Sequence, residues 1–102
     1  MSTMRRAQLE AMAEEATVDC YDEDEALSGW FAMIEEHLAV PFATVVLGVE
    51  VVVEEVDLRG SQIVAVCSRG AHRQAIGVLD LPLPSPAPEG AEWIEAFSQW
   101  AS

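Results

Sequence analysis

An acidic segment near the start of the chain carries the residues with the clearest potential for chemistry. Residues 19–25 read Asp-Cys-Tyr-Asp-Glu-Asp-Glu and hold five carboxylates. Such a density of like charge is relieved by protonation, by a basic partner or by a divalent cation with oxygen ligands. Calcium accepts flexible oxygen ligands more readily than magnesium does. The segment therefore predicts calcium binding, with a solvated acidic face or a docking surface for a basic protein as alternatives.

The spacing of these acids differs from that of an EF-hand loop. If Asp22 were the first position, Leu27 would stand at position six, where glycine is needed, and Met33 at position twelve, where glutamate is needed. A calcium site here must be assembled in another way. The acids also suit a local role, because carboxylates at a helix N-terminus accept hydrogen bonds from free N–H groups.

Carboxylates further along the chain are candidates to join the first group in space. Asp57 and Asp80 stand where predicted strands end, although aspartate at such positions commonly accepts hydrogen bonds within a turn. Glu54 and Glu55 interrupt a run of valines. At least one of them is expected to point outward, and the other suits an exposed strand edge, where charge discourages association between sheets.

Other types of site find less support. Cys67 and His72 could form a nucleophile–base pair, but no third catalytic group or oxyanion element accompanies them. The sequence has no Gly-x-Ser-x-Gly motif and no phosphate-binding glycine loop, so we expect no enzymatic activity. Cys20 and Cys67 do not form a disulfide or zinc-binding pattern and are expected to be buried thiols. His37 is expected to be an ordinary packing or surface histidine.

Composition excludes several classes of partner. The 102 residues carry 18 acidic and five basic side chains, a net charge of −13, while 51% of them are hydrophobic. The basic residues are scattered arginines, with no lysine, so neither nucleic acid nor an anionic membrane is an expected partner. The sequence shows neither an apolar signal segment nor a stretch long enough to span a membrane. We therefore expect a cytoplasmic protein.

The first part of the chain predicts two helices. Residues 4–16 have helical spacing of apolar residues, and a second helix is expected to follow the acidic segment and to end near Val40, before Pro41. Small and acidic residues on its solvent side leave a bare strip that an ion or another segment could approach. The expected apolar side comprises Leu27, Trp30, Phe31, Ile34 and Leu38, and the solvent side Ser28, Gly29, Ala32, Glu35 and Glu36.

The rest of the chain predicts short antiparallel strands and a closing helix. Residues 42–58 are too long for one straight strand and change phase near Gly48, which indicates two strands. After a proline-rich bridge, a last helix is expected to bury Trp93, Ile94, Phe97 and Trp100. Further strands are expected at residues 62–68 and 74–81, with turns at 59–61 and 69–73.

These elements predict an α+β fold. We expect N-terminal helices, an antiparallel meander or small barrel of four or five strands, and a C-terminal helix. The expected organisation is an N-terminal helical extension, residues 1–18, followed by a single domain, residues 19–102.

Several short motifs, in this order, resemble the small bacterial calcium-binding family typified by cyanobacterial CcbP. No single motif is diagnostic, and the resemblance rests on their order and spacing over about residues 19–100, which leaves the helix at 4–16 outside it. The motifs are Tyr21-Asp22-Glu23-Asp24-Glu25, Gly29-Trp30, Ile34-Glu35-Glu36-His37-Leu38, Pro41-Phe42, Val56-Asp57-Leu58, Leu79-Asp80-Leu81-Pro82-Leu83 and Glu92-Trp93-Ile94-Glu95-Ala96-Phe97 with Trp100.

The resemblance implies a calcium-binding protein without EF-hands that acts as a cytosolic calcium buffer or sensor and has an α+β fold. It implies a cation surface on the acidic segment and on nearby helical carboxylates, at Asp22, Asp24, Glu25, Glu35 and Glu36. Asp57 and Asp80 are secondary candidates for the same surface.

Overall fold

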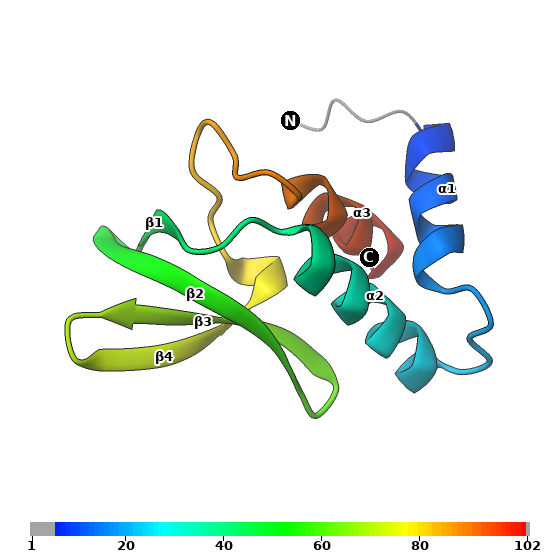
Figure 1. Cartoon of the computed structure of the whole chain (residues 1–102), viewed down its shortest axis with the longest axis horizontal. Helices are drawn as coiled ribbons and strands as arrows, with labels where there is room; N and C mark the ends of the chain where they lie inside the picture. The colour runs from blue at the N-terminus through cyan, green and yellow to red at the C-terminus, as the bar shows by residue number, and fades with distance from the viewer. Residues whose placement is uncertain (1–5, 102) are drawn as a thin grey trace.

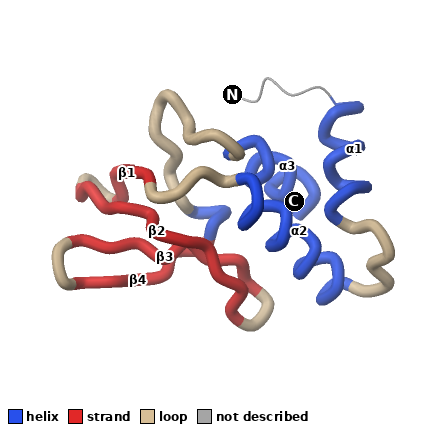
Figure 2. Tube along the Cα trace, viewed as in Figure 1, coloured by secondary structure: helices blue, strands red, loops and turns tan. Residues whose placement is uncertain are grey.

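A computed structural model describes residues 6–101, which form a helical half and a sheet half. Figures 1 and 2 show the three helices gathered at one end of the molecule and the strands at the other. None of the helices within these residues has the length and apolar character of a membrane span. The elements are α1 (Arg6–Ala16), α2 (Glu23–His37), β1 (Phe42–Val46), β2 (Val49–Arg59), β3 (Gln62–Arg69), β4 (His72–Gly77), the 3-10 helix η1 (Val78–Asp80) and α3 (Ala91–Ala101).

This architecture confirms the predicted α+β fold with a four-stranded meander. The sheet order is β1-β2-β3-β4, and every neighbouring pair is antiparallel. Helix α1 covers most of the range predicted for the first helix, of which residues 4 and 5 lie outside the described residues. The change of phase near Gly48 is a tight turn between β1 and β2, where this glycine has a φ of +79°.

Two predicted boundaries are wrong for tertiary reasons. Helix α2 ends at His37 rather than near Val40, because Leu38 is already extended and the N–H of Ala39 donates to the carbonyl oxygen of Glu89 at 2.8 Å. The fourth strand was expected to cover residues 74–81, but β4 ends at Gly77. The chain then tightens into η1, which places Val78 in the core with 1% of its surface exposed.

A β-bulge in β2 determines which of its side chains face the core. The pairing of β2 with β3 shifts between Val53 and Glu55, so Glu54 is an extra residue. The shift allows Val53 and Val56 to be buried while both glutamates remain exposed. Strand β1 pairs with β2 only as far as Val53, so among the described residues the second half of β2 has no strand partner on that side.

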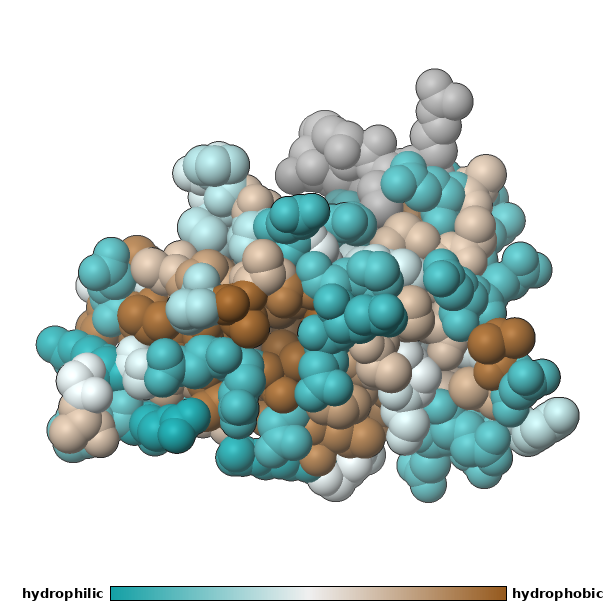
Figure 3. Space-filling view, viewed as in Figure 1, coloured by the Kyte–Doolittle hydropathy of each residue, from teal (hydrophilic) through white to brown (hydrophobic). Residues whose placement is uncertain are grey.

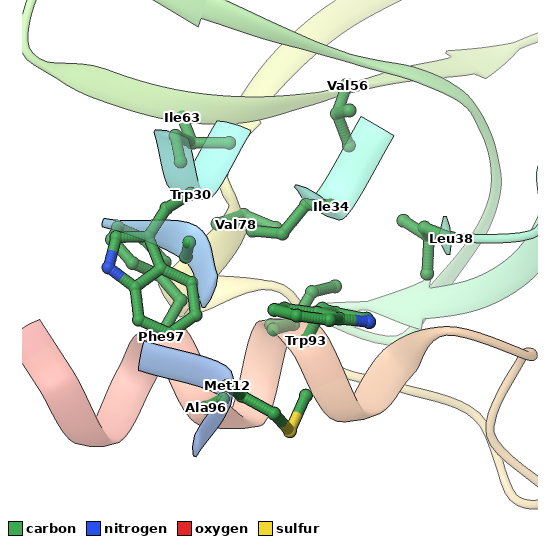
Figure 4. Close-up of a cluster of buried hydrophobic side chains, with 12 residues drawn as sticks. Met12, Trp30, Ile34, Leu38, Val56, Ile63, Val78, Trp93, Ala96 and Phe97 are labelled. Carbon is green, nitrogen blue, oxygen red and sulfur yellow. The ribbon is translucent and has the colours of Figure 1, made fainter. Parts of the chain in front are cut away.

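The main hydrophobic core lies between the helices and the sheet, with Trp30 at its centre (Figure 4). Trp30 has no exposed surface, and its ring centroid lies 5.6 Å from that of Phe97 and 6.3 Å from that of Trp93. Within residues 6–101 its indole N–H has no hydrogen-bond partner, so packing alone holds the side chain. A second cluster of buried residues comprises Val51 and Val53 of β2, Ala65 and Cys67 of β3, and Leu81.

Three residues depart from the expected burial. Trp100 is 41% exposed rather than buried, and Cys20 is only partly buried, whereas Cys67 is fully buried. Gly29 was expected on the solvent side of α2, but it packs against the backbone carbonyl of Ala16 at the end of α1, where a Cβ would overlap that carbonyl. The bare strip on α2 is therefore covered in part by another segment of the chain.

Helix α1 is joined to the same core as the rest of the chain. Met12 and Ala16 are buried and belong to the cluster around Trp30. The predicted division at residue 18 stays a prediction, but the packing ties α1 to α2 and α3.

The start of α3 also packs closely against the end of α2. Gly90 has a φ of +89°, and a Cβ at this position would overlap the backbone of His37 and Leu38. The hydrogen bond between Ala39 and Glu89 lies beside this contact. The turn before α3 is therefore fixed to the C-terminal end of α2 by main-chain contacts.

Candidate metal centre

The acidic segment runs directly into α2, and two of its carboxylates have local roles. The N–H of Glu25 donates to Asp22 Oδ1 at 2.8 Å, so Asp22 is the N-cap of α2. In return, the N–H of Tyr21 donates to Glu25 Oε2 at 3.4 Å. The bond to Asp22 confirms the predicted capping role, because it satisfies an N–H group in the first turn that the helix itself leaves free.

We expect Asp22→Ala to lower the free energy of unfolding by about 1 kcal/mol, because it removes the capping acceptor. Urea denaturation followed by circular dichroism measures the change. Asp22→Asn is the matched control, since it keeps a capping oxygen while removing the charge. Equal losses in the two variants would contradict the capping role and indicate an effect of charge.

Asp24 and Asp80 come together at a groove that we call the acidic groove. It has a volume of about 540 Å³. The first turn of α2 borders it on one side and η1 on another. Asp80 Oδ2 and Gln62 Nε2 both lie close to Gly77, each 3.4 Å from the position that a Cβ would occupy there. Its lining residues are Glu23, Asp24, Leu27, Ser61, Gln62, Ile63, Gly77, Val78, Leu79, Asp80, Phe97, Trp100 and Ala101.

Glu35 and Asp57 come together at a second, smaller hollow, which we call the β2 hollow. It has a volume of about 220 Å³ and lies between the C-terminal half of α2 and the half of β2 that lacks a β1 partner. Glu55 contributes a third carboxylate to the same hollow. The lining residues are Ile34, Glu35, Leu38, Val40, Glu55, Val56 and Asp57.

Asp57 is the most constrained of these carboxylates. Its Oδ2 accepts a hydrogen bond from Arg59 Nε at 3.0 Å, and its Oδ1 accepts one from the N–H of Leu58 at 2.9 Å. The bond from Arg59, followed by that from Leu58, lowers the pKa of Asp57 below its usual value. Asp57 therefore has the local role expected of an aspartate at a strand end, and Glu35 and Glu55 are the other charges in the β2 hollow.

Glu25 and Glu36 line neither of the two hollows. Glu36 Oε2 lies 3.8 Å from His37 Nε2 on the exposed side of α2. The ring of His37 stacks on Trp93 with centroids 5.1 Å apart. The structure thus places Asp24 and Asp80 at the acidic groove and Glu35 and Asp57 at the β2 hollow, and the other predicted carboxylates elsewhere on α2 and at its N-cap.

The donor chemistry of both hollows suits calcium, although their side chains are not gathered around one point. Within residues 6–101 no group of three or more carboxylate, imidazole or thiol side chains stands close enough to hold a metal ion. Calcium accepts six to eight oxygens from flexible carboxylates, main-chain carbonyls and water. The side chains of Glu35 and Glu55 are both exposed and are therefore free to change rotamer.

Cys67 lacks the environment of a reactive thiol. Burial raises the pKa of its thiol, which keeps the sulfur protonated at neutral pH. Cys67 and His72 both line a further hollow, separate from the acidic groove and the β2 hollow. His72 is the first residue of β4 rather than part of the predicted turn. Proximity alone does not make this pair a nucleophile and its base.

Comparison with known protein families shows the family to which this chain belongs. The model of a family named for CcbP and described as calcium binding matches residues 10–101. The chain belongs to the CcbP calcium-binding family. Calcium is therefore the ion associated with the family of this chain. The match begins at residue 10, so the family model includes most of α1, unlike the resemblance seen from residue 19 onward.

A solved structure of a CcbP protein has the same fold as this chain. The crystal structure of CcbP from Anabaena matches with a TM-score of 0.72 and covers 99% of this chain and 95% of its own. The two sequences are 18% identical, so this likeness shows the fold. A comparison with curated protein sequences gave no significant match.

Two acidic residues that line the hollows of this CcbP family member were not among the calcium ligands predicted from the sequence. Glu23 lines the acidic groove beside Asp24, and Glu55 lines the β2 hollow beside Asp57. For Glu55 the sequence held a signal: two adjacent glutamates between Val53 and Val56 indicate a bulge that keeps both valines buried. For Glu23 no signal distinguishes it from its acidic neighbours.

Proposed function

We propose that this protein is a cytoplasmic calcium buffer or sensor that binds the ion through surface carboxylates and catalyses no reaction. Membership of the calcium-binding family over residues 10–101 is the observation that carries the proposal. The charge of −13, the hydrophilic residues over much of the face shown in Figure 3 and the carboxylates at the two hollows support it.

The β2 hollow is the stronger of the two proposed calcium sites. Its small volume suits an ion with bound water rather than an organic ligand, and its carboxylates, like those of the acidic groove, come from two different elements. Beyond Val53, β2 lacks a strand partner on the side of β1 among the described residues, so main-chain carbonyls there could add to the carboxylate oxygens. Glu35 and Glu55 are the proposed principal ligands.

The acidic groove is the second proposed site, with Asp24 and Asp80 as ligands. Ser61 and Gln62 at the same groove could supply neutral oxygens. Asp22, Glu25 and Glu36 remain predicted members of the wider cation surface, where they would attract calcium through charge without enclosing it.

We expect calcium to bind saturably to chelator-treated protein in isothermal titration calorimetry. The double variant Glu35→Gln/Glu55→Gln is expected to weaken the stronger site by about tenfold or more, since calcium affinity follows the number of ligand charges. Glu50→Gln is the matched control, because Glu50 is an exposed glutamate of the same strand outside the β2 hollow.

Thermal unfolding gives an independent readout of the same site. Calcium at 100 times its dissociation constant is expected to stabilise the wild type by about 2.7 kcal/mol, because the ion binds the folded state. Sodium chloride of equal ionic strength serves as the control for screening. Equal stabilisation by the two salts, or equal calcium affinity in the double and control variants, would overturn the proposed site.

A further inference from the structure

The acidic groove has features that calcium binding alone does not require. Its floor is apolar, formed by Leu27, Ile63, Val78 and Phe97, and it is bordered by two apolar side chains that stay exposed. Leu79 is 50% exposed and Trp100 is 41% exposed. Large apolar side chains exposed around a concave surface mark sites of interaction with other molecules.

The charges around this apolar floor all have the same sign. Glu23 and Asp24 stand on the α2 side and Asp80 on the η1 side, and no basic side chain lines the groove. The arginines of the sheet lie elsewhere: Arg59 pairs with Asp57, and Arg69 and Arg73 line a different hollow. The groove therefore combines apolar contact area with a negative potential that is not neutralised by its own lining.

This combination selects the chemistry of the occupant. An anionic lipid surface, a phosphate group or a nucleic acid would be repelled by the three carboxylates and by the net charge of −13. A neutral apolar ligand would leave the carboxylates without partners. A helix with apolar residues on one face and lysine or arginine at its margins satisfies both features, as in the helix-in-groove mode of peptide recognition.

We propose that the acidic groove docks a cationic amphipathic helix of a partner protein. Two or three apolar side chains of the helix would contact Leu27, Phe97 and Trp100, while flanking basic groups would face Asp24 and Asp80. A volume of about 540 Å³ lies within the usual range for a ligand site and accommodates such side chains. This inference goes beyond calcium binding and does not depend on the β2 hollow. At the acidic groove, the basic groups of the partner and a calcium ion would compete for Asp24 and Asp80.

The test uses a synthetic leucine–lysine peptide of about 18 residues, with leucine on one helical face, which is long enough to form a helix. Binding to the full chain is measured in buffer with EDTA, so calcium does not contribute. The peptide has no tryptophan, so covering Trp100 is expected to shift the protein's emission to shorter wavelength. A lysine–serine peptide of equal charge and a leucine–glutamate peptide are the two comparison ligands.

Variants of the protein locate the binding surface. Leu79→Ser and Asp24→Asn/Asp80→Asn are each expected to weaken binding by about tenfold, because each removes part of the apolar or charged complement. Leu47→Asn and Glu50→Gln are the matched controls: Leu47 is 98% exposed in the β1–β2 turn, and Glu50 is exposed on β2. Circular dichroism verifies that every variant is folded.

Preference for the leucine–lysine peptide, lost in the groove variants and retained in the controls, supports the proposal. Equal binding of the lysine–serine peptide would overturn it and show attraction by general surface charge. Light scattering on the free chain gives a further check. A dimer that Leu79→Ser dissociates would also overturn the proposal, since the groove would then be occupied by a second copy of the chain.

Discussion

Trp30→Ala is expected to lower the free energy of unfolding by about 3–5 kcal/mol, the range for removing a large buried aromatic side chain. Trp30 is fully buried at the point where α1, α2, α3 and the sheet meet, and it contacts Phe97, Trp93 and Trp100. The total stability of a small domain is about 5–15 kcal/mol. The variant should therefore be largely destabilised, and urea denaturation with far-ultraviolet circular dichroism measures the loss.

Trp100→Ala is the matched control for this substitution. Trp100 has the same side chain and belongs to the same group of rings, but it is 41% exposed, so its removal creates a smaller buried cavity. We expect a loss of about 1–2 kcal/mol, within the range of ordinary substitutions. A loss in Trp100→Ala as large as that in Trp30→Ala would show that Trp30 is not the centre of the core.

Gly90→Ala is expected to have the second large effect, for two independent reasons. The φ of +89° disfavours any residue with a Cβ, at about 1–2 kcal/mol. The added Cβ would also overlap the main chain of His37 and Leu38, which cannot rotate away as a side chain would. Overpacking of this kind adds about 1–3 kcal/mol. Thermal and urea unfolding should both show the combined loss.

Gly48→Ala separates these two contributions. Gly48 has a similar φ of +79°, but no atom lies within 4 Å of the position that its Cβ would occupy. Its substitution should therefore show the backbone contribution alone. If the two alanine variants lost equal stability, the contact between Gly90 and the end of α2 would contribute nothing.

The sequence predicted those parts of the fold that depend on local periodicity and on turns. The acidic start of α2, the apolar face of this helix and the break between two strands near Gly48 are all short-range patterns, and the structure confirms them, with Asp22 as the N-cap and a turn at Gly48. The predicted ends of α2 and β4 were wrong because long-range contacts determine them. Ala39 finds its hydrogen-bond partner in Glu89, and Val78 turns into the core.

The arrangement of the predicted ligands depends even more on long-range packing. Glu35 and Asp57 are 22 residues apart, and Asp24 and Asp80 are 56 residues apart. Only the crossing of α2 over β2 and the position of η1 bring each pair to one hollow. Sequence spacing showed that acids are dense before and at the start of α2, but gave no means of deciding which of them line a hollow together with a distant carboxylate.

From the way α1 is attached, we expect this helix to detach before the rest of the molecule unfolds. Among the described residues, α1 buries only Met12 and Ala16, whereas α2 and α3 share a continuous set of aromatic contacts. Segments with few buried contacts detach at a lower free energy than the core, as small cooperative units. Detachment of α1 would uncover Gly29 and the neighbouring sulfur of Cys20 while leaving the β2 hollow intact. A partly unfolded form of this protein would thus keep its proposed stronger calcium site.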